Sequence, residues 1–107
     1  MTNPSKQRGT AAETAVVRYL ESKGYTAERR TMQGAGNDKG DIVIHGRPEL
    51  VIEVKNTKRI DLGAFVDELM VEMHNAGATG GVLIVNRRGT TDVSRWYWLC
   101  VGDARPL

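Results

Sequence analysis

Two apolar stretches separated by a short gap constrain this chain most strongly. The first is residues 42–44, Ile-Val-Ile, and the second is residues 50–54, Leu-Val-Ile-Glu-Val, followed by Lys55. Segments of this length and composition predict two β-strands joined in a hairpin. The second strand carries Glu53 between apolar neighbours, and a buried charge is costly unless it is paired or binds a metal.

The register of this hairpin decides which side chains meet. Side chains alternate along a strand, so Glu53 and Lys55 share one face. A connection through residues 46–48 sets Asp41 opposite Glu53, whereas a shift of one residue would move Asp41 to the apolar face. In the first register both carboxylates and Lys55 cluster together. The opposite face is then a continuous core surface of Ile42, Ile44, Leu50, Ile52 and Val54.

Two opposed carboxylates predict a cation between them. Their Cβ atoms would lie about 4.5–5.5 Å apart, and carboxylates this close repel each other without a positive charge. Ligands that are all oxygen favour Mg²⁺, with Mn²⁺ as a substitute, over Zn²⁺. Asp41, Glu53 and Lys55 therefore indicate a divalent-metal site suited to phosphodiester hydrolysis.

This arrangement resembles the PD-(D/E)xK nuclease superfamily. Its motif is an acidic residue at the start of one strand and Glu/Asp-x-Lys in the next. Asp41 and Glu53-Val54-Lys55 match the motif, although Gly40 stands where the motif has proline. The resemblance implies that Asp41, Glu53 and Lys55 are catalytic. It also implies that the backbone carbonyl of Val54 is a further metal ligand and that the products carry a 5′-phosphate and a 3′-hydroxyl.

Glu13 has two interpretations from the sequence. Thr10 and Glu13 have the spacing of a capping box, in which Glu13 bonds back to the first residue of a helix. On that helix Glu13 also shares a face with the apolar side chains of Val16, Val17 and Leu20. This second placement makes Glu13 a candidate catalytic and metal-site acid.

Over roughly residues 6–86 the chain resembles archaeal Holliday junction resolvases in particular. In that family the first helix supplies a glutamate, after Lys-Gly or Arg-Gly and before a Lys-Gly-Tyr/Phe ending. Arg8-Gly9, Glu13 and Lys23-Gly24-Tyr25 follow this pattern. The resemblance implies a structure-selective endonuclease that acts on four-way or other branched DNA. Symmetric cleavage of two strands needs two sites, which implies a homodimer.

Two alternatives stay open from the sequence. One is a nonspecific, nicking or restriction-type nuclease of the same superfamily. The other is a non-catalytic nucleic-acid-binding module on the same fold, against which the intact Asp41, Glu53 and Lys55 argue. The chain contains nothing that resembles a base-reading helix or a zinc finger, so sequence-specific cutting is the less favoured kind of cleavage.

The pattern along the chain predicts a single α/β domain, a mixed β-sheet flanked by helices in the order α-β-β-β-α-β-β. We expect residues 1–9 to form a flexible arm and residues 10–107 to form the domain. The helices are expected at residues 10–23 and 62–76, the second between a cap at Asp61 and an end at Gly77. The strands are expected at residues 25–32, 41–44, 50–55, 81–86 and 93–101.

The charges favour a polyanionic partner. The chain has 15 lysines and arginines against 13 acidic residues, a net charge of +2, with basic residues gathered around the predicted acidic site. A solvated mixed surface explains the same pattern, and Arg87-Arg88 stays open between the two explanations. The candidate DNA-contacting residues are Lys6, Arg8, Arg29, Arg30, Lys39, Asn56, Lys58 and Arg59.

The expected location is intracellular, cytoplasmic or nucleoid-associated, without a membrane partner. A single cysteine excludes an intrachain disulfide and is typical of a reducing compartment. No apolar run approaches the ~20 residues of a membrane span. The first eight residues lack the apolar region of a signal peptide.

The last predicted strand is rich in large apolar side chains. Trp96 and Trp98 alternate with Tyr97, Leu99 and Val101, so both faces of the strand are apolar. One face can pack on the core of the domain, and the other would remain exposed unless something covers it. We therefore expect this strand to contribute to the dimer interface.

Overall fold

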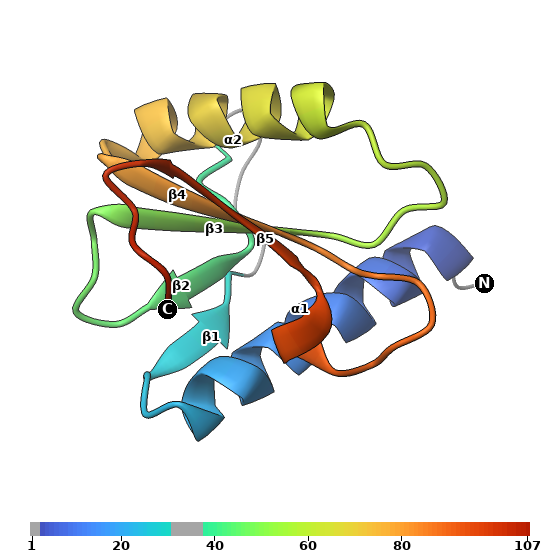
Figure 1. Ribbon diagram of the computed structural model, residues 1–107. Helices are drawn as coiled ribbons and strands as arrows, with labels where there is room; N and C mark the ends of the chain where they lie inside the picture. Colours follow the sequence, from blue (N-terminus) through green and yellow to red (C-terminus); the bar gives the residue numbers. More distant parts are fainter. Residues whose placement is uncertain (1–2, 31–37) are drawn as a thin grey trace.

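A mixed five-stranded sheet between two helices forms the protein (Figure 1). The computed structural model describes residues 3–30 and 38–107. The elements follow the predicted order, with one 3₁₀ helix before the last strand. They are α1 (Pro4–Ser22), β1 (Ala27–Arg29), β2 (Ile42–Ile44), β3 (Leu50–Lys55), α2 (Leu62–Ala76), β4 (Gly80–Val85), η1 (Val93–Arg95) and β5 (Tyr97–Gly102).

The strands lie in the sheet in their order along the chain. β1, β2 and β3 are antiparallel neighbours, β4 is parallel to β3, and β5 is antiparallel to β4. The parallel pair requires a crossover, and α2 provides it. Ile42 pairs with Ile52, so the antiparallel register sets Asp41 opposite Glu53. The predicted hairpin register is confirmed.

Each face of the sheet has its own core under its own helix. On the α1 face, Ala12, Val16 and Leu20 pack against the five aliphatic side chains of the hairpin. On the α2 face, Leu69 packs against Val51, Leu83 and Val85. The side chains of Glu53 and Lys55 alternate with the first set along β3, so they belong to the α2 face.

The second helix has the predicted ends. The Asp61 side chain accepts a hydrogen bond from the amide of Ala64 at 3.1 Å, and Gly77 closes the helix in a left-handed conformation with φ 64°. On this helix the sequence predicts an apolar stripe of Leu62, Phe65, Val66, Leu69 and Met73. The prediction is wrong for Leu62, which is 43% exposed at the start of α2.

The start of α1 differs from the prediction. The helix begins at Pro4, so residues 4–9 are helical and do not belong to an arm. Proline is well suited to the first turn of a helix, where its missing amide is not needed, and Gln7 donates its amide to the carbonyl of Asn3. Thr10 therefore lies inside α1 and is not its cap. The capping-box interpretation of Glu13 is wrong.

The last strand is shorter than predicted, and both of its faces are partly buried. Val93–Arg95 forms η1, which begins where the Asp92 carboxylate accepts the Ser94 amide, and β5 starts at Tyr97. Trp98 packs with the core under α1, whereas Leu99 packs with the core under α2. Each face of this strand therefore has core contacts, and its contribution to a dimer interface stays a prediction.

The predictions of the first strand and of no membrane span can be compared with the described residues only. β1 covers only residues 27–29 of the strand expected at 25–32, and residues 31–32 lie outside the described residues. Within the ranges 3–30 and 38–107, neither helix combines the length and apolar character needed to cross a bilayer.

Candidate active site

Gly40 determines how Asp41 enters the site. Its φ is 96°, and a Cβ at this position would lie 2.7 Å from Val51 Cγ1 and 2.9 Å from the carbonyl oxygen of Ile52. Proline cannot adopt this φ, which accounts for glycine in place of the motif's proline. The close approach lets the Asp41 amide donate to Ile52 at 2.8 Å.

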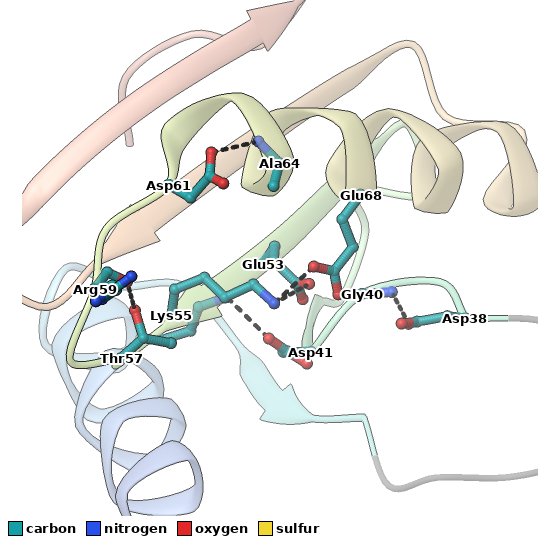
Figure 2. Close-up of polar contacts among 11 residues, drawn as sticks. Asp38, Gly40, Asp41, Glu53, Lys55, Thr57, Arg59, Asp61, Ala64 and Glu68 are labelled. Carbon is teal, nitrogen blue, oxygen red and sulfur yellow. Dashed lines mark hydrogen bonds and ion pairs between the residues drawn. The ribbon is translucent and has the colours of Figure 1, made fainter. Parts of the chain in front are cut away.

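The Asp41 carboxylate is fixed against β3. Its Oδ2 accepts a hydrogen bond from the amide of Val54 at 2.9 Å (Figure 2). The carbonyl of Asp41 accepts the Arg30 amide at 2.7 Å, which ties the residue to the β1 side as well. Asp41 is therefore held on both sides by main-chain hydrogen bonds.

Glu53 is a buried carboxylate with an unsatisfied oxygen. The residue is 2% exposed, and within the described part of the chain its Oε1 has no hydrogen-bond partner. Burial raises the pKa of Glu53, and the neighbouring carboxyls of Asp41 and Glu72 raise it further. Such a group is stable at neutral pH only with a proton or with a cation beside it.

Lys55 points across the same face toward the carboxylates. Its Nζ lies 2.7 Å from Oε2 of Glu68 and 3.6 Å from Oε2 of Glu53 (Figure 2). It also lies 5.3 Å from the centre of the Phe65 ring. Burial by itself lowers the pKa of Lys55, but the hydrogen bond to Glu68 and the surrounding carboxylate charges outweigh it and raise the pKa. The ammonium is thus charged and held in place.

Glu13 extends from α1 toward the acidic residues, but its carboxylate is paired with Arg29. Its Oε1 forms an ion pair with Nε of Arg29 on β1 at 2.9 Å. Burial raises the pKa of Glu13, the hydrogen bond from Arg29 opposes this, and the charge of Asp41 raises it further. The structure therefore brings Glu13 into electrostatic reach of Asp41, and it gives Arg29 a partner other than DNA.

Helix α2 adds acidic residues that the sequence analysis missed. Glu72 is 1% exposed, and neither of its carboxylate oxygens has a hydrogen-bond partner within the described ranges. Glu68 lies one turn earlier, and Asp38 faces both from the loop before β2. The missed signal was available: Glu72 follows Leu69 by three residues and so interrupts the expected apolar stripe, as Glu13 does on α1.

The donor set fits a divalent cation. Buried carboxylates with unpaired oxygens come from β3 and α2, and Asp41 stands at their edge. Oxygen ligands of this kind are those preferred by Mg²⁺ and Mn²⁺. The residues present therefore fit the ion that the motif implies.

Three of the predicted DNA-contacting residues meet in one groove. Arg8, Asn56 and Lys58 line it together with Arg87 and Arg88, where the ends of β3 and β4 face the first turns of α1. The Asn56 side chain donates to the carbonyl of Arg8 at 3.4 Å and closes one side of this groove. Of the remaining predicted residues, Lys39 is half-buried and the exposed ones outside the groove are Lys6, Arg30 and Arg59.

A sheet of this topology, with Asp41 facing Glu53-Val54-Lys55 across one hairpin, defines a nuclease of the PD-(D/E)xK class. A family model named Mrr_cat and described as restriction endonuclease matches residues 5–97, and the chain belongs to this family.

Among solved structures, the chain is similar to Hjc from Archaeoglobus fulgidus, a Holliday junction resolvase from an archaeal hyperthermophile. The TM-score is 0.57 and the sequence identity is 24%, over 88% of this chain and 76% of that chain. At this identity the likeness establishes a shared fold. It confirms the predicted fold class.

Proposed function

We propose that the protein is a Mg²⁺-dependent endonuclease that hydrolyses phosphodiester bonds in branched DNA, with four-way junctions as its preferred substrate. One observation carries the proposal. Asp41 and Glu53 are set side by side under the ammonium of Lys55, and Glu53 is buried with an oxygen that lacks a partner among the described residues. A site that keeps such a carboxylate is arranged for a cation.

Asp41, Glu53 and the carbonyl of Val54 are the proposed ligands of the ion. Bound there, Mg²⁺ would polarise the scissile phosphate and lower the pKa of a water molecule. The hydrogen bond from Val54 to Asp41 keeps the carboxylate in place before the ion arrives. Glu13, paired with Arg29, is proposed as a further acid at the border of the site.

Lys55 is the proposed electrostatic catalyst. Its ammonium is held by Glu53 and Glu68 on the face that carries the proposed ligands. A fixed positive charge at this place stabilises the negative charge that develops on phosphate during attack by water. The same charge orients the attacking water toward the phosphorus.

The basic groove is the proposed path of the DNA backbone. It begins at Asn56, directly after Lys55, and it carries Arg8, Lys58, Arg87 and Arg88. Contacts of arginine and lysine with phosphates position a duplex without reading its sequence, which suits a structure-selective enzyme. Proposed outer contacts are Lys6, Arg30, Lys39 and Arg59, whereas Arg29 neutralises Glu13.

The similar solved structure and the matching family point to different DNA substrates. Hjc, whose fold this chain shares, is a Holliday junction resolvase, whereas the matching family is described as restriction endonuclease. The second candidate function is therefore a nonspecific or restriction-type nuclease with the same site. A junction resolvase would act as a homodimer, because one chain offers a single hairpin site. It would act inside the cell, where recombining DNA is found.

The two candidates differ in cleavage of three substrates. The purified protein is incubated with a four-way junction, with linear duplexes of the same arm sequences and with supercoiled plasmid, each with Mg²⁺, Mn²⁺ or EDTA. We expect paired cuts in the junction with Mg²⁺ or Mn²⁺, slower cutting of the duplexes, and none with EDTA. Equal rates on junction and duplex favour the restriction-type or nonspecific nuclease. Binding without any cleavage contradicts the enzyme and favours the non-catalytic module.

A further inference from the structure

A second group of carboxylates lies beside the proposed catalytic site. One oxygen from each of Asp38, Glu68 and Glu72 lies within 4.8 Å of the others. Two hydrogen bonds hold Asp38: its carboxylate accepts the Gly40 amide of its own loop at 2.9 Å, and its carbonyl accepts the side chain of Asn75 on α2 at 2.9 Å. The loop residue is thus anchored where it faces the helix.

Glu72 is the member of this group that requires an explanation. It is 1% exposed and both of its oxygens lack hydrogen-bond partners in the described part of the chain. An isolated buried carboxylate is costly, and here Glu53 lies next to Glu72 and adds a third oxygen without a partner among the described residues. Hydrophobic packing alone would favour leucine or methionine at this position of α2.

We propose that Asp38, Glu68 and Glu72 form a second divalent-cation site, which shares Glu53 with the catalytic site. The proposal rests on the proposed function for the identity of the cation, Mg²⁺ or Mn²⁺, and on this chain's own residues for the site. Glu72, buried and without a partner among the described residues, supplies the innermost ligand, and the exposed Asp38 and Glu68 close the site from the solvent side.

The spacing of the oxygens is suitable for a cation of this size. Two oxygens on opposite sides of Mg²⁺ lie about 4.2 Å apart, and those around a larger cation such as Ca²⁺ about 4.6–5.2 Å apart. The three carboxylates already lie within 4.8 Å of one another, so a small closure suffices for Mg²⁺. The remaining positions around the ion would be taken by water, which Mg²⁺ retains readily.

The existing contacts leave donor atoms available. Glu68 uses Oε2 for Lys55 at 2.7 Å, which leaves Oε1 for a cation. Glu53 uses Oε2 toward Lys55 at 3.6 Å, and its buried Oε1 is the proposed shared atom. Five carboxylates, with Lys55 as the ammonium among them, therefore offer enough oxygen donors for two ions. They are Asp38, Asp41, Glu53, Glu68 and Glu72.

Mn²⁺ binding to the free protein tests the proposal without any cleavage. Titration followed by electron paramagnetic resonance counts bound ions, and ¹⁵N-labelled protein shows which amides Mn²⁺ broadens. We expect two ions per chain in the wild type and one in Glu72→Gln. Asp41→Asn should likewise bind one ion, and in each variant the broadened amides should lie around Asp41, Glu53 and residues 68–72.

Glu21→Gln, an exposed acid on α1, is the matched control and should bind two ions. Melting curves without metal verify that each variant folds. One ion per chain in the wild type, or two ions in Glu72→Gln, would overturn the second site. That result leaves the proposed nuclease intact, whereas failure to cleave any DNA with two ions bound would count against the nuclease and leave the second site.

Discussion

At the scale of single residues, Gly40 shows how one backbone position determines the chemistry. Its φ is 96°, and an added Cβ would lie only 2.7 Å from the Val51 side chain, so the position has room for glycine alone. Asp41 follows directly, and its carboxylate can reach the Val54 amide only because the chain passes this close to β3. The fold and the proposed catalytic site therefore depend on the same residue.

We predict that Gly40→Ala destabilises the protein and slows cleavage. The strained φ costs about 1–2 kcal/mol for a residue with a side chain, and the clash with β3 adds to it. Gly24→Ala is the control, because Gly24 has the same φ of 96° but nothing within 4 Å of its Cβ position. Urea unfolding should show a larger loss for Gly40→Ala, with a slower single turnover. Equal losses would mean that β3 yields to the added methyl group.

Asp41→Asn and Glu53→Gln should each abolish cleavage and leave DNA binding largely intact. The carboxylates are assigned to the metal, and the removal of negative charge does not weaken attraction to phosphate. Junction binding by fluorescence anisotropy is measured beside cleavage with Mg²⁺. Glu21→Gln should cleave as the wild type does. Near wild-type cleavage by either site variant would show that the assignment of the site is wrong.

Lys55→Ala should lower the cleavage rate on the order of 10²-fold, the scale of losing one preorganised electrostatic group. It should also lower the melting temperature without metal, since Glu53 and Glu68 lose their shared cation at 3.6 and 2.7 Å. Single-turnover kinetics and melting curves check both parts. An unchanged rate would make Lys55 a structural residue that merely neutralises the carboxylates.

At the scale of elements, the sequence predicted the hairpin better than the start of α1. The register followed from two constraints that agree, the short connection and the separation of aliphatic from charged faces. The start of α1 was missed because the capping pattern at Thr10 hid a better signal, Asn3 followed by Pro4. Glu72 interrupts the apolar stripe of α2, but its proximity to Asp38 and Glu53 depends on the loop before β2 and on β3, which no helical pattern contains.

The cap of α2 gives the prediction at this scale. Asp61→Ala should lower the free energy of unfolding by about 1 kcal/mol, the usual value of such a cap. The Ala64 amide then loses its partner at 3.1 Å, and the first turn of the helix that carries Glu68 and Glu72 becomes less stable. Urea unfolding measures the loss, and Asp61→Asn should retain most of the stability. Equal losses in both variants would show that the charge of Asp61, not its hydrogen bond, stabilises α2.

At the scale of the whole molecule, the sequence predicted the class of fold and the hairpin that sets Asp41 opposite Glu53. Strand alternation and helical periodicity depend only on neighbouring residues. They were therefore sufficient to predict the order of the elements and the shared face of Asp41, Glu53 and Lys55. Burial of a strand face, in contrast, depends on residues that are distant in the sequence. Trp98 packs with the core under α1 and Leu99 with the core under α2, which no pattern in residues 93–101 reveals.

The remaining apolar surface moves the expected dimer interface to α2. Leu62, Val66 and Met70 recur every four residues and so form one stripe. Leu62 is 43% exposed, Met70 is 54% exposed, and the neighbouring Val71 is 60% exposed. Apolar side chains gathered on one surface mark an interface more often than scattered ones do.

We predict a homodimer that buries this stripe. Light scattering at micromolar concentration should give twice the chain mass of 11.8 kDa for the wild type. A charge placed in the stripe, Met70→Glu, should give monomers, because an unpaired charge in a buried interface is costly. Tyr97→Glu is the matched control: Tyr97 is 45% exposed on β5, the strand that the sequence favoured, and its variant should remain dimeric. If Tyr97→Glu alone gives monomers, the interface is at β5 after all.

A wild type that stays monomeric even on a four-way junction would contradict both the dimer and symmetric cleavage. One chain would then cut one strand, and the protein would be a nicking nuclease.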